Sequence, residues 1–178
     1  MTEAIMARYD EDFFLWSKTQ AEALRDAARG TTNLPIDWEN VAEEIESLGS
    51  SDKRELGSQI RRIVEHLVKL SHSPATDPRS GWRASIIDAR IQIEVVLDDS
   101  PSLRGQVPEI IRQQAERGAR LAIANLADRA ELDAALKREL QSKSYRDLFS
   151  YTPEQILGDW FPADPQVRPP SRRSRKKP

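Results

Sequence analysis

Apolar residues recur every three or four positions along most of the chain, which is the spacing of one face of an α-helix. The spacing predicts six helices, over residues 10–29, 37–48, 52–70, 81–97, 101–126 and 128–140, and a short final helix over 153–157. We therefore expect an all-α fold, a compact single-domain bundle of about six helices.

Residues that favour helix ends separate these segments. Asp37 is a predicted N-cap, and Gly49 is predicted to stop the helix that Asp37 begins. Pro108 should kink or restart the fifth helix, because proline cannot donate a backbone hydrogen bond. Gly118, on the apolar face of that helix, indicates close approach of a neighbouring helix. Thr152 begins a capping box, T-P-E-Q, at the start of the final helix.

The segment 91–95, I-Q-I-E-V, has two interpretations. It alternates like a half-buried strand, but no second strand pattern exists with which it could pair. As a helix it has two apolar stripes, one of Trp82, Ile86, Ala89, Ile93 and Val96 and an opposite one of Ile87, Ile91 and Val95. We favour the helix. A helix that is apolar on two faces is either buried centrally or lies in an oligomer interface.

Composition limits the chemistry. The 178 residues are 38% hydrophobic and 31% charged, with no cysteine and two histidines. Disulfides, thiol nucleophiles and cysteine zinc sites are therefore excluded, and any metal site would depend on carboxylates. No apolar run reaches the ~18 residues of a membrane span, so we expect no membrane association. The start, MTEAIMARYDED, lacks the apolar core of a signal sequence, so we expect a cytoplasmic protein.

Charge is distributed unevenly between two parts of the chain. The net charge is −2, but residues 165–178 contain no acid and carry six basic residues, namely Arg168, Arg172, Arg173, Arg175, Lys176 and Lys177. The remaining residues, 1–164, carry a net charge of −8. We predict an all-α domain over 1–164 and a disordered, basic, proline-rich tail over 165–178. This tail either contacts nucleic-acid phosphates weakly or only keeps the protein soluble.

Common catalytic signatures are absent, including phosphate-binding glycine loops, H-E-x-x-H and G-x-S-x-G. Arg61 and His66, with four residues between them, resemble the active motif of an all-α ribonuclease superfamily, the higher-eukaryote and prokaryote nucleotide-binding domains. On a regular helix, however, these two residues would be ~140° apart, whereas Arg62 and His66 would be neighbours. The spacing therefore gives little support to catalysis by this motif.

A better candidate is a set of polar residues beside the apolar stripes of three helices. Its members are Glu43, Glu44, Glu46, Arg62, His66 and Arg83. If the helices pack together, we expect His66, Arg83 and at least one of these glutamates within ~8 Å of each other. The cluster would be a small acid–base or anion site, or an ion-pair network that sets helix packing. Glu43 and Glu46 have the spacing of a carboxylate Mg²⁺ pair, but nothing else completes such a site.

Several motifs resemble one known family. They occur in the same order at 9–16 (YDEDFFLW), 37–49 (DWENVAEEIESLG), 66–70 (HLVKL), 80–86 (SGWRASI), 100–103 (SPSL) and 151–156 (YTPEQI). Over roughly residues 9–162 the chain resembles a bacterial family of uncharacterised proteins, domain of unknown function number twenty-nine. The resemblance implies an all-α fold and implies no activity or cofactor.

Three functions remain open at this point. The first is a non-catalytic helical module that binds another protein or itself, which the two apolar stripes of segment 81–97 favour. The second is an enzyme of nuclease or phosphotransfer type that uses His66, Arg62 and the glutamates. The third is a nucleic-acid binder that acts through the basic tail.

Overall fold

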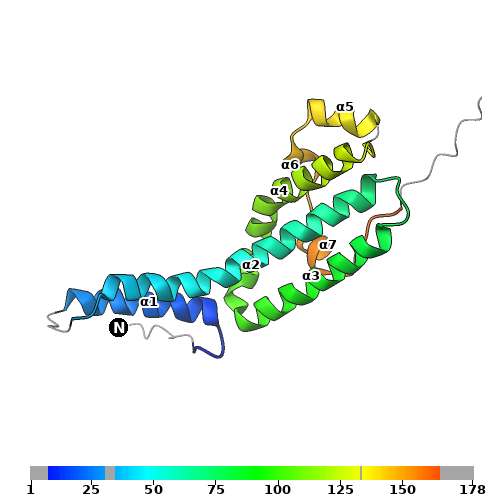
Figure 1. Ribbon diagram of the computed structural model, residues 1–178. Helices are drawn as coiled ribbons and strands as arrows, with labels where there is room; N and C mark the ends of the chain where they lie inside the picture. Colours follow the sequence, from blue (N-terminus) through cyan, green and yellow to red (C-terminus); the bar gives the residue numbers. More distant parts are fainter. Residues whose placement is uncertain (1–7, 31–34, 133, 165–178) are drawn as a thin grey trace, which may run out of the picture.

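The computed structural model describes residues 8–30, 35–132 and 134–164, and within these ranges it contains helices and no strand. The helices are α1 (Phe13–Arg29), α2 (Trp38–His72), α3 (Arg79–Asp99), the 3₁₀ helix η1 (Pro101–Gln106), α4 (Val107–Asp128), α5 (Ala134–Ser142), α6 (Tyr145–Leu148) and α7 (Pro153–Leu157) (Figure 1). The all-α prediction is confirmed. Segment 91–95 lies inside α3, so its strand-like alternation does not form a strand.

The largest departure from the sequence prediction is α2. Residues 37–48 and 52–70 do not form two helices but one helix of 35 residues, about 50 Å long at 1.5 Å per residue. Asp37 is its N-cap, as predicted, and accepts a hydrogen bond from the backbone N–H of Asn40. Gly49 does not end the helix. It is buried against α1, so its missing side chain permits close packing and does not cause a turn.

The long helix belongs to two parts of the molecule. Its first half packs antiparallel to α1, and this α1–α2 hairpin projects from the rest of the molecule (Figure 1). Its second half packs between α3 and α4. The core lies around this second half, where its fully buried side chains are Leu56, Ile60, Ile63, Val64, Leu67, Val68 and Leu70. These face buried residues of α3 and α4, including Ile86, Ile93, Ile111 and Leu126.

Small and polar residues fix where the helices approach one another. Gly118 of α4 is buried against α2, where a Cβ would lie 2.6 Å from the carbonyl oxygen of Arg61, so the predicted close approach is present. The hairpin is joined to the body through Ser100, whose Oγ accepts from the backbone N–H of Phe14 and donates to Asp52. Asp12 adds two bonds from Ser102, so the start of α1 is held by η1.

The predicted helix over 101–126 is divided into η1 and α4. Pro108 stands in the first turn of α4, where a missing N–H costs nothing, so the helix restarts there as predicted. The sixth predicted helix starts later than expected, at Ala134, and ends at Ser142. The final helix α7 has the predicted capping box between Thr152 and Gln155.

Arg90 of α3 holds the segment around α7 against the body. Its side chain is only 7% exposed, and its guanidinium donates to the carbonyl oxygens of Ile156 (2.9 Å), Gln155 (3.0 Å) and Trp160 (2.8 Å). Burial lowers the pKa of Arg90 from its ordinary value. The guanidinium remains a cation because its ordinary pKa is so high, and the three carbonyl dipoles offset the cost of burying that charge.

Candidate functional site

The six residues predicted to form a polar cluster do not come together. Because α2 is one continuous helix, Glu43, Glu44 and Glu46 lie in its first half and Arg62 and His66 in its second. Twenty residues separate Glu46 from His66, which corresponds to about 30 Å along the helix. The expected separation of ~8 Å therefore fails, and the acid–base cluster does not form. The prediction depended on a break at Gly49 that would have folded one segment back on the other.

Of the three predicted glutamates, Glu46 stabilises the α1–α2 hairpin instead. Glu46 and Glu39 both bind the guanidinium of Arg25 on α1, each at 3.0 Å. These hydrogen bonds raise the pKa of Arg25, with Glu39 the larger cause. Glu43 and Glu44 are exposed. In the part of the chain that the structure describes, no three or more His, Cys, Asp or Glu side chains are placed to hold a metal ion, so nothing completes a site at Glu43 and Glu46.

Arg62 and Arg83 are also engaged elsewhere. Arg62 reaches from α2 to α3 and pairs with Asp88 at 2.9 Å. Arg83 pairs with Asp164 at 3.1 Å, shares that carboxylate with Arg79, and lies over the ring of Phe161. Hydrogen bonding by Arg79, more than by Arg83, holds the pKa of the Asp164 carboxyl below its ordinary value. Both arginines therefore stabilise packing between segments distant in sequence.

His66 is half-buried on α2 among cationic neighbours. Burial is the main cause that lowers its pKa, Lys69 and Arg62 lower it further, and only Glu65 opposes them. The carboxylate of Glu65 is itself paired with Lys69 at 2.6 Å. The Nδ1 atom of His66 is buried and has no hydrogen-bond partner among the described residues. Burial therefore favours the neutral imidazole, and no carboxylate is hydrogen-bonded to its buried Nδ1 among the described residues to orient it as a general base.

The α1–α2 hairpin has two unlike edges on either side of the line where its helices touch. One edge is polar, because it carries the Arg25 ion pairs. At 100° per residue, apolar residues of both helices fall on the opposite side of that line. We call this set, together with Tyr9 in the turn before α1, the hairpin edge, and its members are Tyr9, Phe13, Trp16, Leu24, Trp38, Val41, Ile45 and Leu48.

Large apolar side chains of the hairpin edge are open to solvent. Leu48 is 54% exposed, Val41 41% and Tyr9 63%. Tyr9 packs edge-on against Phe13 (5.4 Å between ring centroids) and Trp16 (4.9 Å), which makes an aromatic cluster at one end. Three large apolar side chains are therefore exposed on the same edge of the hairpin.

Helical spacing groups the residues of α1 and α2 in this set, but spacing alone does not show whether another element covers them. Trp82 of α3 is buried, whereas Trp16 and Trp38 are only half-buried, because a two-helix hairpin has no third element to cover them. The interaction surface that the sequence predicted, the outer stripe of α3, is also exposed. Its residues Ile87, Ile91 and Val95 are each about half exposed.

The predicted nucleic-acid binding depends on residues outside these helices. The basic tail, 165–178, with its possible nucleic-acid contacts, lies outside the described residues. None of the described helices is both long enough and apolar enough to span a lipid bilayer.

The described residues define an all-α protein with an exposed apolar hairpin edge. The model of one family, domain of unknown function DUF29, matches residues 8–161, and the chain belongs to that family. Its fold resembles the crystal structure of an alpha-helical protein of unknown function from Rhodospirillum rubrum ATCC 11170. The two chains are 25% identical, with a TM-score of 0.67, over 88% of this chain and 92% of that one. A search of curated proteins found no match to this chain.

Proposed function

We propose that this protein is a self-association module that forms a homodimer through the hairpin edge. Two α1–α2 hairpins would pack edge to edge and produce a four-helix bundle across a two-fold axis. The observation that carries the proposal is the exposure of Tyr9, Val41 and Leu48 on one edge of the hairpin, which also holds the partly buried rings of Phe13 and Trp16.

The hairpin lacks a core of its own, which supports the proposal. Its buried residues on α1 are Phe14, Ser17 and Ala21, and those on the first half of α2 are Ala42 and Gly49. Most of these are small, so the contact between the two helices buries little apolar surface. Fully burying a large aliphatic side chain is worth about 1.5–3 kcal/mol, so a half-exposed one leaves roughly 1 kcal/mol to be gained at an interface.

The distribution of charge favours a second copy of the chain as the partner. The ion pairs of Arg25 with Glu39 and Glu46 are on the opposite edge. Two hairpin edges can therefore meet without bringing these charges together, and a two-fold interface needs only one self-complementary surface. The outer stripe of α3 also has three exposed residues, but it belongs to a single helix, whereas the hairpin edge combines residues of two helices; it therefore provides a matched comparison.

The experiment is light scattering on the purified protein and two double variants. The chain has a mass of 20.2 kDa, and we expect the wild type at twice that mass. Val41→Glu with Leu48→Glu should give a monomer, because charges would then be buried in an apolar interface. Ile87→Glu with Val95→Glu on α3 should remain dimeric. Circular dichroism checks that each variant retains its helices.

Two results would contradict the proposal. A wild-type monomer at high micromolar concentration would exclude a stable homodimer. Loss of the dimer in the α3 variant, with the hairpin variant still dimeric, would transfer the interface to α3.

A further inference from the structure

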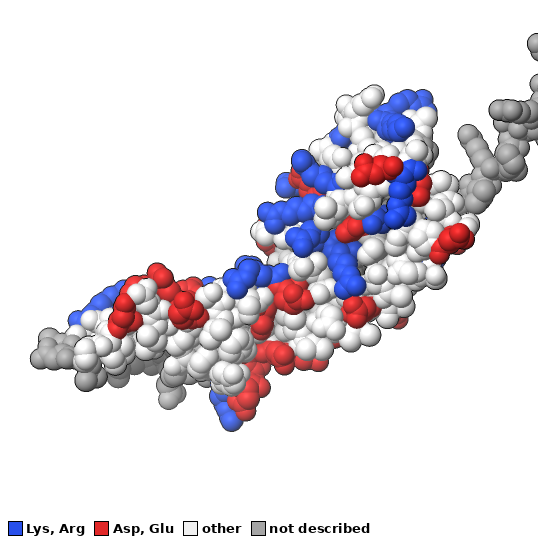
Figure 2. Space-filling model, viewed as in Figure 1, with Lys and Arg blue, Asp and Glu red and all other residues white. Residues whose placement is uncertain are grey.

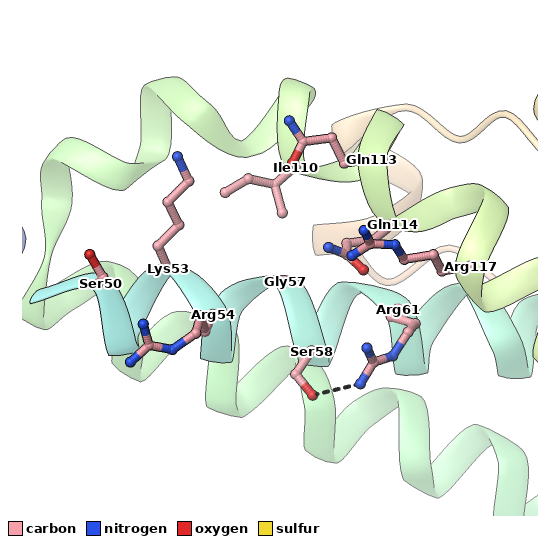
Figure 3. A pocket seen from close by; sticks show the side chains of 10 residues that line it. All are labelled: Ser50, Lys53, Arg54, Gly57, Ser58, Arg61, Ile110, Gln113, Gln114 and Arg117. Carbon is pink, nitrogen blue, oxygen red and sulfur yellow. Dashed lines mark hydrogen bonds between the residues drawn. The ribbon is translucent and has the colours of Figure 1, made fainter. Parts of the chain in front are cut away.

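A cleft of about 470 Å³ lies between α2 and α4 (Figure 3). Its walls are helix faces, one from Ser50 to Arg61 on α2 and one from Ile110 to Arg117 on α4. In each wall the lining residues recur at three- and four-residue intervals, so they project from one side of their helix. Cavities of this size hold small-molecule ligands.

The cleft is strongly basic. Lys53, Arg54 and Arg61 from α2 and Arg117 from α4 line it, and no aspartate or glutamate does. Figure 2 shows Lys and Arg side chains gathered over this face of α2 and α4. Within the described ranges, none of the four cations has a carboxylate within 4 Å. Like charges in one cleft repel each other, so the cleft favours an anion.

The carboxylates closest in sequence to the α4 wall are already bound to other cations. Glu109 pairs with Arg112, and Glu116 pairs with Arg120 at 2.7 Å. On the α2 side, Asp52 accepts a hydrogen bond from Ser100 at 2.7 Å, and Glu55 accepts one from Gln59 at 2.5 Å. None of these carboxylates therefore forms an ion pair with a cleft cation.

The hydrogen bonds of the cleft arginines leave much of their donor capacity unused. Arg54 donates to the carbonyl oxygen of Ser47 at 3.4 Å, and Arg61 donates to Ser58 Oγ at 3.3 Å. Both contacts are long for hydrogen bonds. A guanidinium has five N–H donors, and its planar fork matches two oxygens of a phosphate.

The wall between the cations is kept open by a glycine. Gly57 is buried, and a Cβ there would lie 3.3 Å from Gln114 Nε2 and 3.7 Å from Ile110 Cγ2. The amide of Gln114 extends towards α2 beside Arg117 (Figure 3). Its Oε1 is buried and has no hydrogen-bond partner among the described residues, so this amide is not committed to the fold. The Nε2 group adds a neutral donor beside the four cations.

We propose that this cleft binds a small molecule with two or more phosphoryl groups. Four cations from two helices match the charge of an oligophosphate, and the cleft volume suits a molecule of that size. A long nucleic acid is less suitable, because its backbone would extend past the cleft over a domain whose residues 1–164 carry a net charge of −8. This site is independent of self-association, since it uses neither the hairpin edge nor α3.

Calorimetric titration with inorganic triphosphate tests the proposal. At low salt we expect saturable one-to-one binding, tighter than that of orthophosphate. Arg54→Gln with Arg61→Gln should weaken it by about tenfold or more, because two charge-assisted contacts are lost. The matched control is Arg112→Gln with Arg120→Gln on α4, whose arginines are ion-paired outside the cleft, and it should bind triphosphate like the wild type.

A second double variant distinguishes loss of binding from misfolding of the first one. Lys53→Gln with Arg117→Gln changes two exposed residues of the same cleft and should also weaken binding. The proposal is overturned if triphosphate does not bind, or if cleft and control variants lose affinity equally. It is also overturned if a single-stranded oligonucleotide binds and triphosphate does not, since the surface would then serve nucleic acid.

Discussion

Gly49 of α2 lies directly against Ser17 of α1, so closely that a Cβ on Gly49 would be 1.8 Å from Ser17 Oγ and 2.8 Å from Ser17 Cβ. Ser17 cannot move away easily, because it is buried and its hydroxyl donates to the carbonyl oxygen of Phe14. This contact sets the distance between α1 and α2, and it explains why a glycine stands in the middle of a 35-residue helix.

Gly49→Ala should therefore destabilise the protein despite the higher helix propensity of alanine. Overpacking at a close contact costs roughly 1–3 kcal/mol, and we expect a lower melting temperature in calorimetry. Gly81→Ala is the control, since a Cβ at Gly81 meets nothing within 4 Å. That change should be neutral or stabilising, by up to about 1 kcal/mol. Adding Ser17→Gly to Gly49→Ala should restore part of the loss, and no recovery would contradict the assigned contact.

Arg90→Met should release the segment around α7. The change removes three hydrogen bonds to backbone carbonyls at Gln155, Ile156 and Trp160, and hydrogen bonds from a charged donor are worth roughly 1.5–3 kcal/mol each. We expect faster amide exchange over 153–164 with little change in α2. Arg83→Met, which removes an exposed ion pair, should have a smaller effect. Equal protection in Arg90→Met and wild type would show that the carbonyl contacts do not hold this segment.

Asp164 should make stability depend on pH at the acidic end. Arg79 and Arg83 lower the pKa of its carboxyl below the ordinary value of 3.8. Because the pKa is lower in the folded state, the ionised carboxyl of Asp164 stabilises the protein at pH values above 3.8. This stabilisation is lost as the pH falls through the lowered pKa. Asp164→Asn should therefore be less stable than wild type at pH 7, and the difference should disappear in strong acid. Denaturant midpoints at both pH values measure it, and a difference that grows towards low pH would have the wrong sign.

His66 should titrate below its ordinary pKa of 6.5, since burial disfavours the imidazolium. In the unfolded chain it would take up a proton near pH 6.5, so its contribution to stability is complete above that pH. The contribution falls as pH decreases from 6.5 towards the lowered pKa. His66→Gln should flatten this part of the stability profile. An NMR titration of the imidazole gives the midpoint directly, and a value above 6.5 would mean that a carboxylate, and not burial, dominates.

Local sequence patterns were sufficient to predict most of the helices, because a helix is made from contacts between residues three and four apart. The spacing of apolar residues predicted α1 and α3, and the capping box predicted α7. Gly118 was correctly interpreted as a close approach, while Gly49 was wrongly interpreted as a helix stop. The two glycines look alike in sequence, because what distinguishes a stop from a close contact is the neighbouring helix.

The prediction of the candidate site also depended on whether Gly49 ends a helix or permits a close contact between helices. A helix break at Gly49 would have brought Glu46 near His66, whereas a continuous α2 places them about 30 Å apart. Helical spacing also placed Trp16 and Trp38 on apolar stripes, but spacing does not show whether another element covers a stripe. Arg61 and Arg117 are 56 residues apart, so no local pattern could place them in one cleft.

The sequence by itself determined that the described chain is helical, because periodicity, caps and prolines act over a few residues. Only the tertiary structure decided that α2 is continuous, that the hairpin edge is exposed, and that four cations share one cleft. These features depend on which helices pack together, and that choice is made by the burial of side chains from residues far apart in the chain.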